Sequence, residues 1–230
     1  MDSEAKVTEM NSRLRDIYKP YLQFLQEEFS AEAEYVSLPL FMQIDSTYFQ
    51  NRFKILFIGK ELEEWFGNIS KKEMFNVDNL MNIYQNYQTS GRNDSPFWKF
   101  INDIKNDVNG SDDGGYMWTT ISKFNFHRNT PPPVIQQRND SGFELLREEI
   151  EILQPDMVFF LTGFSYDEQL KHVFPGIDYE MIQKNVMYKI NQEVLPENSL
   201  ILLHPKALEE RGIKEVVKTE ILKELAVLQD

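Results

Sequence analysis

The chain has 230 residues, no cysteine, and 24 Lys and Arg against 37 Asp and Glu, so its net charge is −13. The missing cysteines exclude disulfides, thiolate metal sites, iron–sulfur clusters and a cysteine nucleophile, and only three histidines argue against a His-rich metal site. The acidic charge disfavours nonspecific binding to a phosphate backbone. No apolar run approaches the roughly 18 residues of a membrane span, and the acidic N-terminus lacks the apolar core of a signal peptide, so we expect a cytoplasmic protein.

The first part of the chain has a helical pattern. Apolar residues recur at helical spacing between Val7 and Phe29. Pro20 falls inside this pattern, and because proline lacks the N–H that an interior helix position uses, we expect it to kink the helix or to begin a second one. Residues 34–46 show no regular pattern. We therefore expect an N-terminal helical segment, residues 1–45, packed on a domain formed by residues 46–230.

Short apolar runs in the rest of the chain predict strands that alternate with helices. The predicted strands are residues 53–58, 116–122, 157–161 and 200–203, with a further short strand at 186–190. Helical spacing at 80–87 and 213–225, and capping signals at Ser95, Ser141 and Ser165, predict the helices. Residues 61–76 and 129–137 are predicted loops. This alternation indicates an α/β protein with three α/β/α layers around a mostly parallel four-stranded sheet.

Polar side chains follow two of the predicted strands. The first strand runs into Gly59, Lys60 and Glu61, and the last strand runs into His204 and Pro205. Ligands of open α/β sheets bind in the crevice outside the carboxyl ends of the strands. A carboxylate and an imidazole at two such ends are therefore candidates for one shared pocket, which makes the chain a candidate enzyme.

A stretch without acidic residues lies in the middle of the chain. Residues 114–139 contain no Asp or Glu, although Lys123, His127, Arg128 and Arg138 all fall there. Screening confines exposed charges to about 8–10 Å at physiological salt, so a local basic lip can attract an anion despite the acidic total. The alternative is a surface loop that happens to lack acids, and the sequence leaves both readings open.

The order of these features resembles that of the uracil-DNA glycosylase superfamily. The resemblance rests on four units in order: Gly59-Lys60-Glu61, the strand Met117–Lys123 with Pro131–Pro133 downstream, the helix and strand from Glu144 to Gly163, and His204-Pro205-Lys206. The resemblance implies a uracil-DNA glycosylase-like fold over residues 46–230. It also implies hydrolysis of an N-glycosidic bond of a modified base, without metal or other cofactor, and DNA or a nucleobase-containing ligand as the partner.

The resemblance assigns roles to individual residues. Glu61 would stabilise an oxocarbenium-like sugar or orient water, and His204 would donate a hydrogen bond to the leaving base. Binding of the base would involve Gly59, Lys60, Trp65, Phe66, Thr120 and Asn125, and binding of phosphate would involve Lys123, Arg128 and Lys206. Each residue also has an ordinary structural role open to it, such as a solvated surface acid for Glu61 or a strand-end cap for His204.

Three positions depart from the family pattern. Thr120 stands where the family has the Asn that reads the flipped base, Leu62 replaces a proline, and Lys206 replaces a serine. These departures and the charge of −13 favour an alternative function, a non-catalytic binding or interaction protein on the same fold. The sequence thus supports the position of a site better than it supports a reaction.

Overall fold

The computed structural model describes residues 3–61, 66–71, 73–90, 94–110 and 115–226 of an α/β protein. The chain divides into two compact units, and each is described by itself. Unit 1 comprises residues 1–46, 59–91 and 118–154, and unit 2 comprises residues 47–58, 92–117 and 155–230. The sequence predicted a helical segment of residues 1–45 and a domain of residues 46–230, which differs from these two units. That division stays a prediction. None of the helices in the described part of the chain combines the length and apolarity needed to cross a bilayer.

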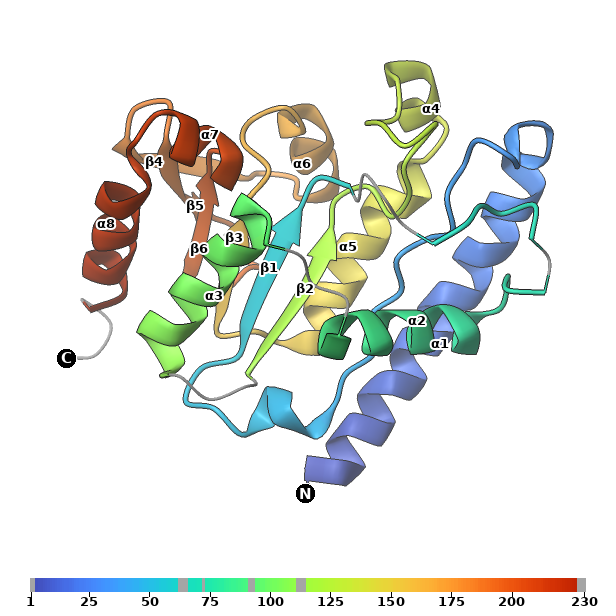
Figure 1. The fold of residues 1–230 in the computed structure, drawn as a ribbon, viewed down its shortest axis with the longest axis horizontal. Coiled ribbons are helices and arrows are strands. Elements are labelled where there is room, and N and C mark those ends of the chain that lie inside the picture. The colour runs from blue at the N-terminus through green and yellow to red at the C-terminus, as the bar shows by residue number, and fades with distance from the viewer. Residues whose placement is uncertain (1–2, 62–65, 72, 91–93, 111–114, 227–230) are drawn as a thin grey trace. The chain divides into compact units, whose positions relative to one another are not determined.

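Unit 2 contains most of a mixed β-sheet, with strand order β2-β1-β3-β6-β5-β4 (Figure 1). The strands are β1 Ile55–Gly59, β2 Tyr116–Thr120, β3 Met157–Phe160, β4 Asp178–Gln183, β5 Met187–Asn191 and β6 Asn198–Leu202. β3 pairs in parallel with β1 and β6, whereas β5 runs antiparallel to both β6 and β4. Every residue of β1 and β3 is buried, as expected for central strands of such a sheet, and the edge strand β2 is buried as well.

The prediction of a four-stranded sheet is wrong, because six strands pair in the described part of the chain. Four predicted strands correspond to β1, β2, β3 and β6, and the short run at 186–190 corresponds to β5. β4 was not predicted, because its sequence Asp178–Gln183 is polar and half-exposed rather than apolar. An edge strand pairs on one side only and needs little burial, so composition does not mark it.

Helices α3 Pro96–Asn109, α6 Asp167–Val173, α7 Pro205–Glu210 and α8 Lys214–Ala226 complete unit 2. Asp103 on α3 forms ion pairs with Lys214 and Lys218 of α8, at 2.8 and 3.7 Å. The capping signal expected at Ser165 lies one residue too early, because Tyr166 is the N-cap of α6.

Unit 1 is built on α1 Ser3–Glu28, α2 Val77–Ser90, α4 Pro133–Gln137 and α5 Asp140–Leu153, with the short 3-10 helix η1 Ser30–Glu32. A second 3-10 helix, η2 Ser46–Phe49, spans the boundary between unit 1 and unit 2 in the sequence. α1 continues through Pro20, so the proline does not begin a second helix.

Two further predictions in unit 1 need correction. Residues 133–137, expected to be extended, form α4 because Pro133 stands at its first turn, where its missing N–H costs nothing. α5 begins at Asp140 with Asn139 as N-cap, not at a capping box on Ser141. A Cβ at Gly142 would lie 2.5 Å from the Tyr21 hydroxyl, so α5 packs on α1 at a position that only glycine fits.

Candidate functional site

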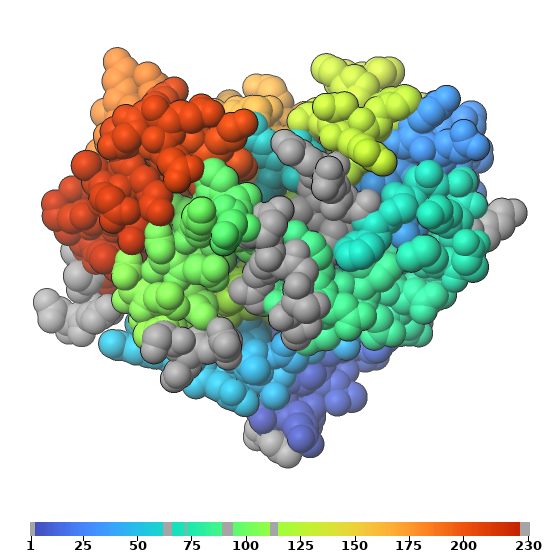
Figure 2. All heavy atoms as spheres, in the orientation of Figure 1, coloured from blue at the N-terminus to red at the C-terminus, as the bar shows by residue number. Residues whose placement is uncertain are grey.

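Unit 1 contains an open cavity of about 720 Å³. Its lining comes from segments far apart in the sequence: Glu34, Tyr35, Ser37, Phe66, Gly67, Asn68, Lys71, Tyr87, Asn125, His127 and Arg128. On the face drawn in Figure 2, blue atoms of the stretch before residue 40, teal atoms near residue 70 and yellow-green atoms of α4 all reach the surface. The cavity falls within the usual volume range of small-molecule pockets, about 300–1,000 Å³.

Aromatic rings form much of the pocket wall. Tyr35 and His127 stack with their centroids 4.0 Å apart and their planes 23° from parallel. Phe66 meets Tyr87 edge to face at 6.3 Å. Tyr35 is 46% exposed and Phe66 is 44% exposed, which is unusual for large apolar side chains that serve only packing. Exposed rings around a cavity are suited to stacking on a planar ligand.

A tight turn presents two of the pocket residues. His127 and Arg128 both have left-handed backbone conformations, with φ of 52° and 62°. Each such non-glycine residue costs on the order of 1–2 kcal/mol. The turn is held by hydrogen bonds from the His127 N–H to the Tyr35 carbonyl at 2.9 Å and from the Arg128 N–H to Asn125 Oδ1 at 3.2 Å. Strain of this kind concentrates at functional sites.

Two cations stand on the pocket wall. Lys71 and Arg128 are both exposed, and neither forms an ion pair with another of the residues that the structure describes. Among the described lining residues, Glu34, also exposed, is the one carboxylate. Asn125 is buried and adds an amide to the pocket lining. The pocket therefore offers positive charge, aromatic faces and an amide to one ligand.

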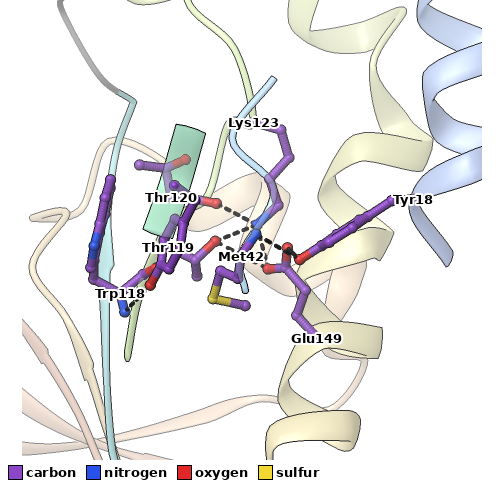
Figure 3. A network of polar contacts seen from close by, with 8 residues as sticks. Tyr18, Met42, Trp118, Thr119, Thr120, Lys123 and Glu149 are labelled. Carbon is purple, nitrogen blue, oxygen red and sulfur yellow. Dashed lines mark hydrogen bonds and ion pairs between the residues drawn. The ribbon is translucent and has the colours of Figure 1, made fainter. Parts of the chain in front are cut away.

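A buried polar network lies beside the segment that leads to this turn (Figure 3). Lys123 Nζ donates to Glu149 Oε2 at 2.5 Å, to Thr119 Oγ1 at 2.7 Å and to the Thr120 carbonyl at 3.0 Å. Glu149 also accepts from Thr119 at 3.1 Å and from the Tyr18 hydroxyl at 2.9 Å. Burial lowers the pKa of Lys123, and Glu149 offsets this only in part. Burial, and then Glu149, raise the pKa of Tyr18 well above its ordinary value.

The network ties the 36–42 segment to the pocket turn. The Met42 N–H donates to the Tyr18 hydroxyl at 3.0 Å, and the Leu40 N–H donates to the Lys123 carbonyl at 2.8 Å. Closer to the pocket, the Asn125 N–H donates to Ser37 Oγ at 3.0 Å. The pocket turn is therefore supported by a chain of buried hydrogen bonds that begins at α5.

The prediction that Lys123 binds phosphate is corrected by its surroundings. Its side chain has no exposed surface and is committed to Glu149, so it cannot reach a ligand in solvent. Arg138 is also engaged, because it pairs with Glu28 at 2.7 Å and Glu32 at 2.8 Å. Of the expected basic lip, His127 and Arg128 are the residues that line the pocket.

The residues after β1 belong to unit 1. The carbonyls of Gly59 and Lys60 accept from the N–H groups of Ile121 and Ser122, each at 2.9 Å. Glu61 is half-buried, and its carboxylate accepts a short hydrogen bond from the Thr130 hydroxyl. Glu61 is not among the described residues that line the pocket. Trp65 lies outside the described residues.

His204 belongs to unit 2 and is the N-cap of α7. Its Nδ1 accepts from the Lys206 backbone N–H at 3.3 Å, so the neutral ring carries its proton on Nε2. The ring also stacks on Phe97, with centroids 6.0 Å apart. The Lys206 side chain is exposed. This arrangement gives His204 a hydrogen-bond donor of defined orientation.

The structure brings Phe66, Asn125 and Arg128 together in one pocket. Thr120 is buried at the end of β2 and is not one of the described lining residues. Reasoning from sequence missed Tyr35, Lys71 and Tyr87. Tyr35 and Lys71 stand in stretches without periodicity, and Tyr87 lies on the apolar stripe of α2 and reads as core. No local signal in the sequence distinguishes these pocket residues from ordinary loop or core residues.

The chain matches no protein-family model and no curated protein. Among the residues that the structure describes, no group of three or more His, Asp or Glu is placed to hold a metal ion. The pocket and the residues around it are therefore the basis for proposing a function.

Proposed function

We propose that the protein is a uracil-DNA glycosylase-like protein, with three α/β/α layers, whose pocket in unit 1 binds a nucleobase-containing ligand. The observation that carries this proposal is the pocket lining. It combines the aromatic rings of Tyr35, Phe66 and His127, the amide of Asn125 and the cation of Arg128. Stacking of a base on an aromatic side chain contributes about 1–3 kcal/mol, so two such contacts support binding of a base.

The reaction that we propose for this ligand is hydrolysis of an N-glycosidic bond. Glu61 would stabilise positive charge on the sugar or orient the attacking water. Its half-burial supports this role, because a carboxylate interacts more strongly with a cation away from bulk water. His204 belongs to unit 2, and its role as a donor to the leaving base stays a prediction that this proposal does not use.

A non-catalytic base-binding protein is the second candidate. The specific observation in its favour is the hydrogen bond from Thr130 to Glu61, which occupies one oxygen of the proposed catalytic carboxylate. Thr120 is also buried, so no side chain at that position reads a base in the manner of the family. On this reading the pocket keeps its binding role and Glu61 serves to hold Thr130.

Base release and base binding together test these two candidates. Wild type and Glu61→Gln are incubated with single- and double-stranded DNA carrying a panel of modified bases, and with the corresponding nucleosides, and free base is measured by chromatography. We expect release by wild type and a loss of about 100-fold or more in Glu61→Gln, within the range for general catalysis by a side chain. Glu180→Gln, an exposed acid on β4, is the matched control.

Binding to the same panel by calorimetry separates the outcomes. Binding without release would support the non-catalytic candidate. Release that Glu61→Gln does not diminish would rule out the proposed role of Glu61. If no base-containing compound binds, the proposal of a base-binding pocket is wrong. It is also wrong if a compound binds and Tyr35→Ala leaves its affinity unchanged.

A further inference from the structure

The two cations on the pocket wall specify the ligand further. We infer that the pocket takes a nucleoside monophosphate, with its single phosphate held by Lys71 and Arg128, rather than a DNA strand. This inference rests on the proposed binding of a base in the same pocket. It assigns Lys71 a role that no sequence pattern indicated.

The state of the two cations supports a monophosphate as the ligand. Lys71 and Arg128 come from separate segments, both are exposed, and within the described part of the chain neither pairs with a carboxylate. Several other cations of unit 1 are paired, as Arg138 is with Glu28 and Glu32. An acidic protein that leaves two cations beside one cavity has a local preference for an anion there. Arg and Lys with aromatic neighbours are suited to the phosphate of a compound that carries a ring.

The position of the cations relative to the aromatic rings also supports a monophosphate. Arg128 follows His127 in the strained turn, and His127 stacks on Tyr35 at 4.0 Å. Lys71 packs its aliphatic part close to Gly67, which also lines the pocket. A ring stacked on this aromatic wall would therefore place a phosphate attached to its sugar near the cations. The strain in the turn supports this reading, because it holds Arg128 in a conformation that arginine seldom adopts.

A single strand of DNA matches the charges around the pocket less well. A single strand binds along a row of cations that follows its backbone, and its affinity depends on the number of phosphates contacted. Lys123 is fully buried and Arg138 is paired, so the acid-free stretch of residues 115–139 does not present such a row. The net charge of −13 repels every further phosphate. A cavity of about 720 Å³ is also of a size that suits one small ligand.

Glu34 limits the charge of the ligand. Its carboxylate is exposed on the same wall, and its backbone carbonyl accepts from Asn68 Nδ2 at 3.2 Å, which fixes the local backbone. Among the described lining residues, one carboxylate stands beside two cations, and a single phosphate, which carries about −1.5 to −2 at pH 7, already balances their net positive charge. A triphosphate would add charge without a partner, so we expect the monophosphate to bind best.

Calorimetry on the full chain tests the inference. The ligands are the five common nucleobases, each as nucleoside, 5′-monophosphate and 5′-triphosphate, together with inorganic phosphate and a short single-stranded oligonucleotide of each base. We expect at least one monophosphate to bind about tenfold or more tightly than its nucleoside, as charge-assisted hydrogen bonds to phosphate predict. Inorganic phosphate alone should bind weakly, because it lacks the ring.

Substitutions assign the phosphate to the two cations. Arg128→Gln and Lys71→Gln should each remove most of the tenfold gain, on the order of fivefold, while affinity for the nucleoside changes by less than about twofold. Lys99→Gln, an exposed lysine on α3 outside the pocket lining, is the matched control and should change neither affinity. Circular dichroism confirms folding. If Arg128→Gln does not fold, the affinities of Lys71→Gln test the inference alone, because an exposed lysine can be replaced without loss of the fold.

Each contrary result has a separate meaning. If nucleoside and monophosphate bind equally well, the inference is overturned while the base-binding proposal stands. Tighter binding of the oligonucleotides than of every monophosphate overturns it in favour of a strand. Inorganic phosphate that binds as tightly as a monophosphate overturns it in favour of a simple anion site. If nothing that contains a base binds, the proposed function fails, and this inference fails with it.

Discussion

Glu149 holds the ammonium of Lys123 at 2.5 Å in a place where neither side chain has exposed surface. The same carboxylate accepts from Tyr18 and Thr119, so all of its neighbours in this network are donors. A buried pair of this kind adds little net stability compared with apolar residues, but it is costly to break because the remaining charge has no partner. The pair instead holds the chain in place, since the Lys123 carbonyl and the neighbouring Asn125 support the pocket.

Breaking the pair from the side of Glu149 should destabilise the protein strongly. We expect Glu149→Gln to lower the free energy of unfolding by about 3–5 kcal/mol, because it leaves the Lys123 ammonium buried without a counter-charge. Lys123→Met keeps the volume of the side chain and removes the charge. The double variant should be more stable than the sum of the two single losses predicts, by about 2 kcal/mol. Urea unfolding measures all three variants, and additive losses would show that the two groups do not interact.

The pair also makes stability depend on pH. Burial lowers the pKa of Lys123 in the folded protein, so the unfolded chain binds more protons between that lowered pKa and the ordinary value of about 10.4. The free energy of unfolding therefore rises with pH across that window. Below the lowered pKa, Lys123 is charged in both states, and the destabilising effect of its burial is complete. We expect wild type to gain stability relative to Lys123→Met as the pH rises from neutral towards 10, and an unchanged difference would contradict the direction of the pKa shift.

At the scale of elements, apolar content decides what can be read from sequence. β1, β3 and β6 were predicted because central strands bury nearly every side chain and so form apolar runs. β4 was missed because an edge strand can remain polar. The start of α5 was misplaced because Gly142 and Asn139 are fixed by contact with Tyr21, a residue more than a hundred positions away. Such contacts override the local capping preference.

Pro20 offers a test at this scale. It occupies an exposed position inside α1, where it removes one backbone hydrogen bond from the helix. Alanine is better than proline by about 3 kcal/mol in a helix interior, and proline recovers up to about 1 kcal/mol by restricting the unfolded chain. We therefore expect Pro20→Ala to stabilise the protein by roughly 2 kcal/mol, or about 5 °C in Tm.

Lys19→Ala is the control for this change, because Lys19 is the exposed neighbour of Pro20 and pairs with Asp16 only loosely, at 3.4 Å. We expect its effect to stay within about 0.5 kcal/mol. A lower Tm for Pro20→Ala would mean that the proline sets a bend in α1 on which the packing of Tyr18 or Tyr21 depends.

At the scale of the whole molecule, the pocket depends on long-range assembly. Its lining joins residues 34–37, 66–71 and 125–128, and no periodicity or motif links these three segments. Arg128 was a candidate because local composition marked a stretch without acids, and Asn125 and Phe66 were candidates because of the resemblance. Burial removed Lys123 from the same set. Residue type can be read from sequence, whereas exposure depends on what packs nearby.

The acidic charge leads to a prediction for the whole chain. With 24 basic and 37 acidic residues, the folded protein holds a net charge of −13 in a compact volume, whereas the unfolded chain spreads that charge. Self-repulsion therefore destabilises the folded state at low ionic strength. Raising salt from about 10 mM to 150 mM shortens the screening length from about 30 Å to 8 Å, so we expect Tm to rise by several degrees.

The pH supplies the control for this prediction, because the repulsion vanishes near the isoelectric point of about 4.8. Tm measured in sodium chloride and in potassium chloride should rise equally at pH 7, and the rise should disappear or reverse as the pH approaches 4.8. Sucrose at matched osmolality, which does not screen charge, should not reproduce the dependence on pH. A salt effect of the same size at both pH values would mean that the net charge is not its cause. The local ion pairs of unit 1, such as Arg138 with Glu28 and Glu32, would then have to be considered instead.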